Sequence, residues 1–340
     1  VTIEENALID TSSTQAGNGG AIAIWSELKT TVAGILKSMG GVLSGNGGFI
    51  ETSSKGAVSL APTVQINTSA NNQSGKAGTW LLDPVDLTID QAAASIVSAA
   101  LSNNNVTIAV TNSTTACPIG SCTQTNTNSS LTIASGADIL KLGNTYTTLT
   151  LSSEGIFNLN ANISGQNLDV IIQSSIAYLG VGTSMNASKV TVQAQTIYSA
   201  GTIQTSRYLA NANPGSFGNA IELLAQAIYV SGRLSAGTPN GGSTTAGSIK
   251  LDANTITLNS GALLEANGDA GGQITIAAND SIFSSAMIQA NGGNGRGGTL
   301  SLTAANDQYF NQASLQANGT TDGGAMTITT SSGDISFTNS

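Results

Sequence analysis

The sequence contains no histidine, two cysteines and five prolines, and aromatic residues make up only 4% of its 340 positions. Without histidine, the chain lacks both the commonest general base and the commonest metal ligand. Charged residues are scarce at 9% while hydrophobic residues reach 40%. A core can therefore form, but the polar surface must come mostly from Ser, Thr, Asn and Gln. We expect neither a metal site nor a cofactor.

Basic residues are also scarce, which limits the kinds of partner that the chain can bind. Ten Lys and Arg against nineteen Asp and Glu give a formal charge of −9 and a pI near 4.3. Binding to nucleic acid requires a basic stripe, so we expect no nucleic-acid partner. No apolar run approaches the ~20 residues of a membrane span, and we expect no membrane insertion. The sequence opens at Val1 without the apolar core of a signal peptide, so we expect an internal fragment.

Cys117 and Cys122 are the two cysteines, and they lie close together in the sequence. Such a pair suits a small loop closed by a disulfide, which would place the protein in an oxidising compartment. The alternative is a metal site, but two thiols in a chain without histidine leave a zinc ion short of ligands. We favour the disulfide.

Glycine is abundant, with 40 residues, and it recurs beside short apolar runs. Gly17–Gly20 and Gly45–Gly48 both read Gly-Asn-Gly-Gly, and they precede the alternating runs Ala21–Trp25 and Phe49–Glu51. Glycine supplies positive φ at low cost, and alternation is typical of a strand with one buried face. The pattern predicts many short strands joined by tight turns.

One segment departs from this pattern. Asp90 can cap a helix whose apolar residues share one face, so we expect a short helix over 90–102. Strand resumes at Val106–Val110. The segment 111–130 is rich in Ser, Thr and Asn and contains both cysteines. We expect it to be a loop excursion pinned by the disulfide.

The second half of the chain repeats at a nearly constant interval. Four triplets share one pattern, a polar residue between two apolar residues: Ile249–Leu251, Ile274–Ile276, Leu300–Leu302 and Met326–Ile328. Their first residues lie 25, 26 and 26 positions apart (249 to 274, 274 to 300, 300 to 326). A second series, apolar-(Glu or Gln)-Ala-Asn-Gly, begins at Leu264, Ile288 and Leu315. Two series that keep in step indicate one repeating structural unit.

A repeat of this length cannot bury its apolar face alone, so successive repeats must stack, with each strand pairing in parallel with its counterpart in the next repeat. The sequence therefore predicts an all-β parallel β-helix, a solenoid carrying one short helix and one side loop, as a single domain over 1–340. A leucine-rich-repeat horseshoe is the alternative by period, but its Leu-x-x-Leu-x-Leu frame is missing.

Four segments near the start of the chain carry a more specific pattern. They are Gly17–Ser26, Thr31–Gly34, Gly45–Ser53 and Gly75–Pro84, the last followed by Leu87–Ile89. Together they closely resemble the filamentous haemagglutinin and high-molecular-weight adhesin family, the exoproteins of two-partner secretion in Gram-negative bacteria. The resemblance covers about residues 7–110. Beyond that block only the style of repeat is shared.

The resemblance implies a right-handed β-helix in a secreted or cell-surface adhesin. It also implies export of the parent protein, unfolded, through an outer-membrane two-partner secretion transporter. The family's secretion domain and anchoring segment have no counterpart here, so this fragment would be a stalk that attaches to host cells or biofilm matrix. Its receptor or glycan is not specified by the sequence.

Acidic residues are the candidates for catalysis, because β-helices also host polysaccharide lyases and hydrolases that use clustered acids. Glu4 and Glu5 would point to opposite faces of a strand, Asp83 and Asp86 flank Pro84, and the other acids are isolated. The arginines are Arg207, Arg233 and Arg296. We predict no catalytic residues and no enzyme activity, with a polysaccharide-acting β-helix enzyme as the alternative.

Two kinds of site for sugars remain. Trp25 and Trp80 could stack on sugar rings, but each lies in an apolar run, and we expect both to pack internally. Asn-x-Ser/Thr sequons are candidate glycosylation sites, since certain adhesins of the family are glycosylated at such positions before export. The sequons begin at Asn67, Asn72, Asn105, Asn112, Asn128, Asn162, Asn186, Asn279 and Asn318.

Overall fold

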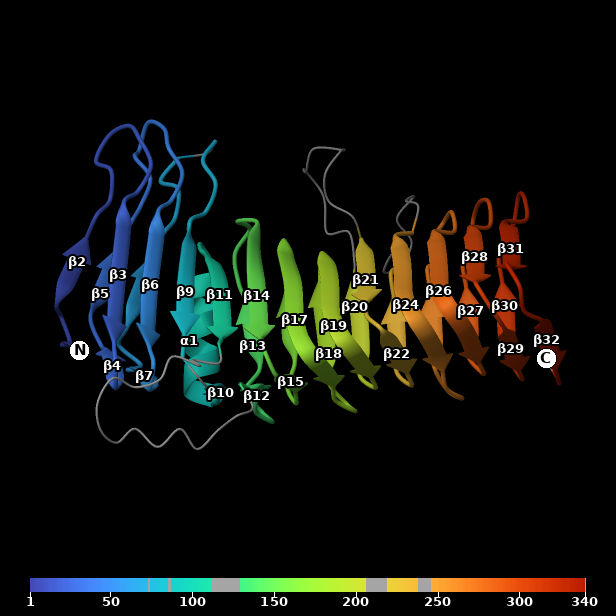
Figure 1. The fold of residues 1–340 in the computed structure, drawn as a ribbon. Helices are drawn as coiled ribbons and strands as arrows, with labels where there is room; N and C mark the ends of the chain where they lie inside the picture. The colour runs from blue at the N-terminus through green and yellow to red at the C-terminus, as the bar shows by residue number, and fades with distance from the viewer. Residues whose placement is uncertain (73, 85–86, 112–128, 206–218, 238–245, 340) are drawn as a thin grey trace. The chain divides into compact units, whose positions relative to one another are not determined.

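A computed structural model of the chain describes residues 1–72, 74–84, 87–111, 129–205, 219–237 and 246–339. Its internal contacts divide it into two compact units, Val1–Ser175 and Ile176–Ser340. Short strands dominate both units (Figure 1), so the expected all-β class is confirmed. The expectation of a single domain over 1–340 stays a prediction.

The first unit is built from groups of short strands, and each pairing within a group is parallel. The longest group contains β3 (Ala21–Ser26), β6 (Phe49–Ser54), β9 (Thr79–Asp83), β11 (Asn105–Val110), β14 (Thr147–Ser153) and β17 (Leu168–Leu179), of which β17 continues into the second unit. The other groups are β1 (Thr2–Ile3), β4 (Lys29–Val32) and β7 (Ala57–Leu60); β2 (Leu8–Asp10), β5 (Ile35–Lys37) and β8 (Gln65–Asn67); β10 (Leu87–Ile89), β12 (Leu131–Ile133) and β15 (Ile156–Leu159); and β13 (Ile139–Lys141) with β16 (Ile163–Gly165). Figure 1 shows β3, β6 and β9 side by side.

The core of the first unit is made of apolar rows that run across the strands. In the longest group, strand register aligns Ile50, Trp80, Val106 and Leu149 on successive strands. All four side chains are fully buried. Their neighbours along each strand point the other way, as the period of two requires. Each of these strands therefore adds one buried side chain to the same apolar column.

The Gly-Asn-Gly-Gly turns use their glycines in two different ways. Gly17 and Gly45, the first glycine of each turn, have φ of 120° and 117°, where glycine is favoured. A Cβ on Gly47 would instead lie 1.6 Å from the carbonyl oxygen of Thr68. Positive φ, expected from the sequence, thus explains the first glycine of the turn, whereas close backbone approach explains the second, Gly47.

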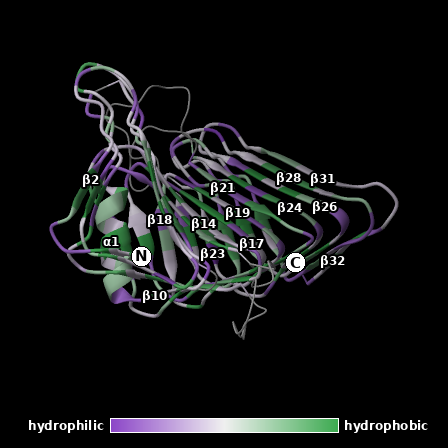
Figure 2. Ribbon diagram, turned by 60° about the vertical axis from the view of Figure 1, so that its left-hand side comes forward, coloured by the Kyte–Doolittle hydropathy of each residue, from purple (hydrophilic) through white to green (hydrophobic). Residues whose placement is uncertain are grey.

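The helix expected after Asp90 is present as α1 (Gln91–Leu101), and the Asp90 side chain accepts a hydrogen bond from the Ala93 amide at 2.9 Å. Ile96, Val97 and Leu101 are among its buried residues, and shades of green mark most of α1 as hydrophobic in Figure 2. It is the only helix in the part of the chain that the structure describes, and none there is long and apolar enough to cross a bilayer.

The second unit repeats the same arrangement with longer strands. One row of parallel strands contains β19 (Lys189–Ser199), β21 (Ala220–Leu224), β24 (Ser248–Leu258), β26 (Gln273–Ser284), β28 (Thr299–Ala304) and β31 (Ala325–Thr330). A second row forms where the far ends of β19 and β24 pair in parallel with β22 (Ala227–Val230) and the far end of β26 pairs with β29 (Gln308–Asn311), which pairs in turn with β32 (Ile335–Thr338). The third row contains β18 (Ser184–Ala187), β20 (Thr202–Thr205), β23 (Arg233–Ser235), β25 (Leu263–Glu265), β27 (Met287–Gln289) and β30 (Ser314–Gln316).

The strand pairing aligns the residues of both repeat series of the second half. Ile249 pairs with Ile274, Ile274 with Leu300, and Leu300 with Met326. In the other series, Leu264, Ile288 and Leu315 are aligned in the same way by β25, β27 and β30. The parallel stacking that the repeats predicted is therefore confirmed.

Candidate functional site

The predicted disulfide lies outside the described residues. Cys117 and Cys122 both fall within 112–128, as does most of the predicted loop 111–130. The pairing of the two cysteines stays a prediction.

The sequons occupy very different environments. The Asn72 amide donates to the carbonyls of Gly41 and Gly45, at 3.0 and 2.7 Å, and Asn105 donates to Ala77 at 3.0 Å. A glycan on the Asn72 nitrogen would replace one of its two hydrogen bonds, because the linkage leaves a single N–H. Asn67 is half-buried, and Asn112 and Asn128 lie outside the described residues. The exposed sequon asparagines are Asn162, Asn186, Asn279 and Asn318, and glycosylation there stays a prediction.

The acids named as catalytic candidates do not form a cluster. Glu4 and Glu5 are exposed near the start of the chain, Asp83 lies on β9, and Asp86 is outside the described residues. Among the described residues, no three Asp, Glu or Cys side chains come close enough to hold one metal ion. The arginines are equally dispersed: Arg233 pairs with Glu265, Arg296 lies 3.7 Å from Asp322, and Arg207 is outside the described residues.

Asp83 is nevertheless electrostatically unusual. Burial raises its pKa above the ordinary 3.8, a hydrogen bond from Thr111 opposes the rise, and the charges of Glu51 and Glu154 add to it. The Thr111 Oγ1 to Asp83 Oδ1 distance is 3.1 Å. Because the folded state holds this proton more tightly than the unfolded state, ionisation of Asp83 destabilises the fold.

Asp83→Asn should therefore stabilise the protein at neutral pH. The wild type loses stability as pH rises from about 3.8 through the raised folded pKa. The amide keeps an acceptor for Thr111 without the charge, so the variant should melt higher than wild type at pH 7 and lose this advantage below pH 4. Circular dichroism melting at both pH values measures the effect. Glu5→Gln, at an exposed carboxylate, is the control, and a lower melting temperature for Asp83→Asn at pH 7 would contradict the argument.

Lys141 is a buried cation that sequence reasoning did not single out. It is 3% exposed, and burial lowers its pKa. A lowered pKa is common in catalytic lysines, but here the Nζ donates to the carbonyls of Gly143 and Gln166, at 3.0 and 2.9 Å. The ammonium group closes a turn, and its hydrogen bonds give it a structural role.

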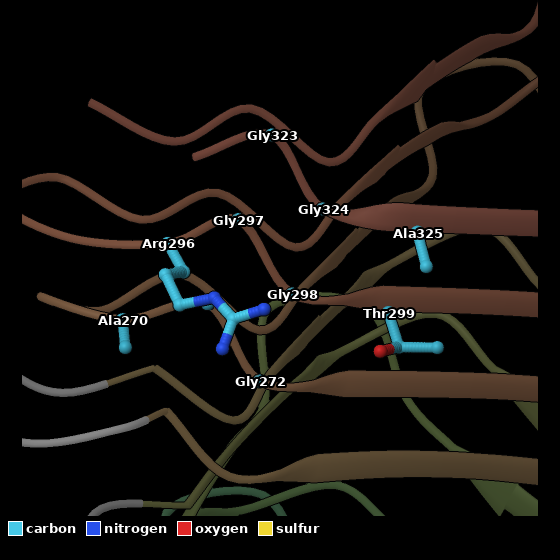
Figure 3. A pocket seen from close by; sticks show the side chains of 10 residues that line it. Ala270, Gly272, Arg296, Gly297, Gly298, Thr299, Gly323, Gly324 and Ala325 are labelled. Atoms are coloured by element: carbon cyan, nitrogen blue, oxygen red, sulfur yellow. The ribbon is translucent and has the colours of Figure 1, made fainter. Parts of the chain in front are cut away.

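A groove of roughly 450 Å³ lies in the second unit, beside three Gly-Gly turns. Figure 3 shows Arg296 extending across it, with Thr299 and Ala325 at the starts of their strands. Gly298 illustrates why the turns lack side chains, since a Cβ there would lie 2.1 Å from the carbonyl oxygen of Gly272. The groove is thus a consequence of tight stacking between neighbouring turns.

The chemistry of this groove is limited. The amides of Gly272, Gly298 and Gly324 each donate to a backbone carbonyl, at 2.8, 2.7 and 2.7 Å, and so are not available to an anion. Arg296 is highly exposed and faces Asp322. The lining provides neither a nucleophile nor a general base.

The two tryptophans have different fates. Trp80 is fully buried, and its Nε1 donates to Thr52 Oγ1 at 3.0 Å, so internal packing is confirmed there. Trp25 is 49% exposed, with Lys55 Nζ 5.4 Å from its ring centre. The expectation for Trp25 was wrong, because on β3 the alternation turns Ile22 and Ile24 inward and Trp25 outward.

A row of outward-facing rings on the second unit was missed by sequence reasoning. Tyr178, Tyr198 and Tyr229 form one stack, with ring centroids 5.0 Å apart at both steps and interplanar angles of 7° and 9°. Phe283 and Tyr309 form a second stack, with centroids 5.3 Å apart. The available signal was an aromatic residue directly after an inward-facing residue, as in Ile-Tyr and Ile-Phe, recurring in several repeats.

The surface beside Tyr198, Tyr229 and Phe283 carries hydroxyl and amide groups, whereas at the other end of the array the Tyr309 hydroxyl donates to the Asp307 carboxylate at 3.0 Å. On β19, β22, β24 and β26 the position two residues before each ring position is Thr196, Ala227, Thr255 and Ser281, of which Ser281 is buried. On the other side the chain continues with Ala200, Ser231, Asn259 and Ser285. We define the ring row as Tyr178, Tyr198, Tyr229, Phe283 and Tyr309. It is the largest aromatic array in the described part of the second unit.

No protein-family model matches the chain, and no curated protein is similar enough to count as a relative. The resemblance to the haemagglutinin and adhesin family thus rests on the segments in the first 110 residues.

Proposed function

We propose that this chain is a non-enzymatic segment of a secreted or surface-exposed bacterial adhesin, in which a right-handed parallel β-helix is a rigid stalk that attaches to host cells or biofilm matrix. The observation that carries the proposal is the continuous register of parallel rows, such as Ile249, Ile274, Leu300 and Met326. Right-handed connection is the rule for parallel strands in one sheet.

Stacked repeats of this kind suit a secreted stalk. Each repeat contacts mainly its neighbours, so folding can propagate from one repeat to the next without an energy source outside the cell. The parent protein would pass unfolded through an outer-membrane two-partner secretion transporter. The family resemblance supports this partner.

The scarcity of charge clusters supports a binding role over catalysis. Many polysaccharide lyases and hydrolases use clustered acids together with a metal ion, and no three of the described Asp, Glu and Cys side chains are placed to hold one. The ring row offers instead a surface of aromatic and hydroxyl groups, with the Asp307 carboxylate at its Tyr309 end, which is a chemistry of binding.

Attachment of the purified chain tests the proposal. Beads coated with the chain should adhere to epithelial cells or to preformed biofilm in a saturable manner, and soluble chain should compete. Beads coated with albumin are the control. Adhesion no greater than the control, or release of new reducing ends from a panel of polysaccharides, would overturn the proposal, and the second result would establish the enzymatic alternative.

A further inference from the structure

The ring row has one gap, at Thr257. Strand register places Thr257 opposite Tyr229 on one side and opposite Phe283 on the other. Parallel strands lie ~4.8 Å apart, so the two rings are separated by roughly 9.6 Å, which is two strand spacings. Rings at neighbouring positions of the row stack with centroids 5.0 and 5.3 Å apart. The gap therefore has the width of one further ring.

The gap has flat walls and a polar floor. Tyr229 and Phe283 each stack on a ring on their outer side, which leaves their inner faces directed at the gap. Ile256 and Leu258 point into the core, so Thr257 points outward between the two rings. Within the described part of the chain, no hydrogen bond engages the Thr257 hydroxyl. Asn259, next on the same side of the strand, is exposed.

We propose that Tyr229, Thr257 and Phe283 form a slot that binds one pyranose ring of a neutral glycan. This inference rests on the proposed adhesin function and names the class of its partner. The faces of a pyranose ring carry C–H groups, which are attracted to the negative face of an aromatic ring. Its hydroxyl groups lie at the rim, where Thr257 and Asn259 can hydrogen-bond to them.

Charge favours a neutral glycan over an anionic one. The residues that flank the slot on β22, β24 and β26 include no lysine or arginine. They are Ala227, Ser231, Thr255, Asn259, Ser281 and Ser285. The chain as a whole carries −9. A sulfated or uronic-acid chain would meet no cation here and would be repelled at long range.

The polar floor favours a sugar over an aromatic side chain of a protein partner. An aromatic ring would match the stacking geometry of the row but would cover the Thr257 hydroxyl without offering it a hydrogen bond. Leaving a covered hydroxyl unpaired costs free energy. A sugar ring can stack on Tyr229 and Phe283 and can also hydrogen-bond to the Thr257 hydroxyl.

Filling the gap is the sharpest test, because it removes the slot without removing a contact. Thr257→Phe supplies the missing ring and should stack between Tyr229 and Phe283, so its melting temperature should equal or exceed that of the wild type. Ser336→Phe is the matched control: Ser336 lies opposite Tyr309, so the variant extends the row by one ring and leaves the slot open.

Calorimetric titration of the full chain with neutral hexasaccharides (cellohexaose, mannohexaose and chitohexaose) measures binding. A heparin hexasaccharide and a tyrosine-rich peptide are the comparison probes. We expect at least one neutral hexasaccharide to bind, Thr257→Phe to weaken it by about tenfold or more, and Ser336→Phe to leave it unchanged. Equal binding by Thr257→Phe and wild type, no neutral glycan bound, or a slot-dependent preference for heparin or the peptide would each overturn the slot.

The two proposals fail separately. Adhesion of chain-coated beads that survives Thr257→Phe, together with equal glycan binding by that variant, would overturn the slot and leave the adhesin function standing. Glycan binding that depends on the slot, with no adhesion to cells or biofilm, would support the slot and overturn the adhesin function.

Discussion

Trp80→Ala should lower the free energy of unfolding by about 4 kcal/mol, the range for removing a fully buried aromatic side chain. Trp80 is 0% exposed, and strand register places it between Ile50 and Val106 in the apolar column of the first unit. The substitution leaves a cavity in the middle of that column and also leaves the buried hydroxyl of Thr52 without its donor at 3.0 Å. Chemical unfolding followed by circular dichroism measures the loss.

The other tryptophan provides the control for this experiment. Trp25 is 49% exposed on β3, and Trp25→Ala removes mainly the ring contact with Lys55, worth about 0.5–1 kcal/mol at an exposed site. Each variant keeps one tryptophan, so fluorescence reports each position alone: Trp80 should emit at shorter wavelength and resist acrylamide quenching. Similar losses of stability in the two variants would contradict the assignment of Trp80 to the column.

The repeat pattern predicted the stacking of the second unit because its turns hold the spacing constant. Ile249, Ile274 and Leu300 recur at nearly equal intervals, and the structure pairs them directly. The cap at Asp90 was equally readable, since a carboxylate followed by residues with one apolar face is a local signal that needs no knowledge of the rest of the fold.

Register was harder to predict where the spacing varies. The triplets Leu149–Leu151 and Leu168–Val170 have the same apolar pattern, but the structure pairs Leu149 with Val170 and not with Leu168. In the same way, Ile50 pairs with Ile22 and not with Ile24, although both isoleucines face the core. A slip of two keeps the same residues facing the core, so alternation alone cannot detect it.

The ring row could not be assembled from sequence for the same reason. Its members sit one per repeat, but the repeats that contain Tyr198 and Tyr229 differ in length from those that contain Phe283 and Tyr309. Only the register shows that these rings share one line and that Thr257 interrupts it. Outward residues are also free of the apolar constraint that makes inward positions recognisable.

Asn104→Ala should destabilise the first unit by about 3 kcal/mol, because it removes four hydrogen bonds of one buried side chain at once. Asn104 is 1% exposed; its Nδ2 donates to the carbonyls of Ile66 and Ala100, at 3.1 and 2.6 Å, and its Oδ1 accepts from the Thr68 amide and hydroxyl, at 2.5 and 3.0 Å. One side chain thus ties the end of α1 to the strand that precedes Thr68.

Two further substitutions test whether the loss of stability comes from these hydrogen bonds or from any change near the end of α1. Asn104→Asp keeps an acceptor for Thr68 but turns a second oxygen toward the carbonyls of Ile66 and Ala100, so it should destabilise at least as much as alanine at neutral pH. Asn103→Ala changes an exposed neighbour and should cost less than about 0.5 kcal/mol. Chemical unfolding of all three variants provides the comparison. A tolerated Asn104→Asp would mean that the donors to Ile66 and Ala100 contribute little, and that the acceptor for Thr68 alone secures the end of α1.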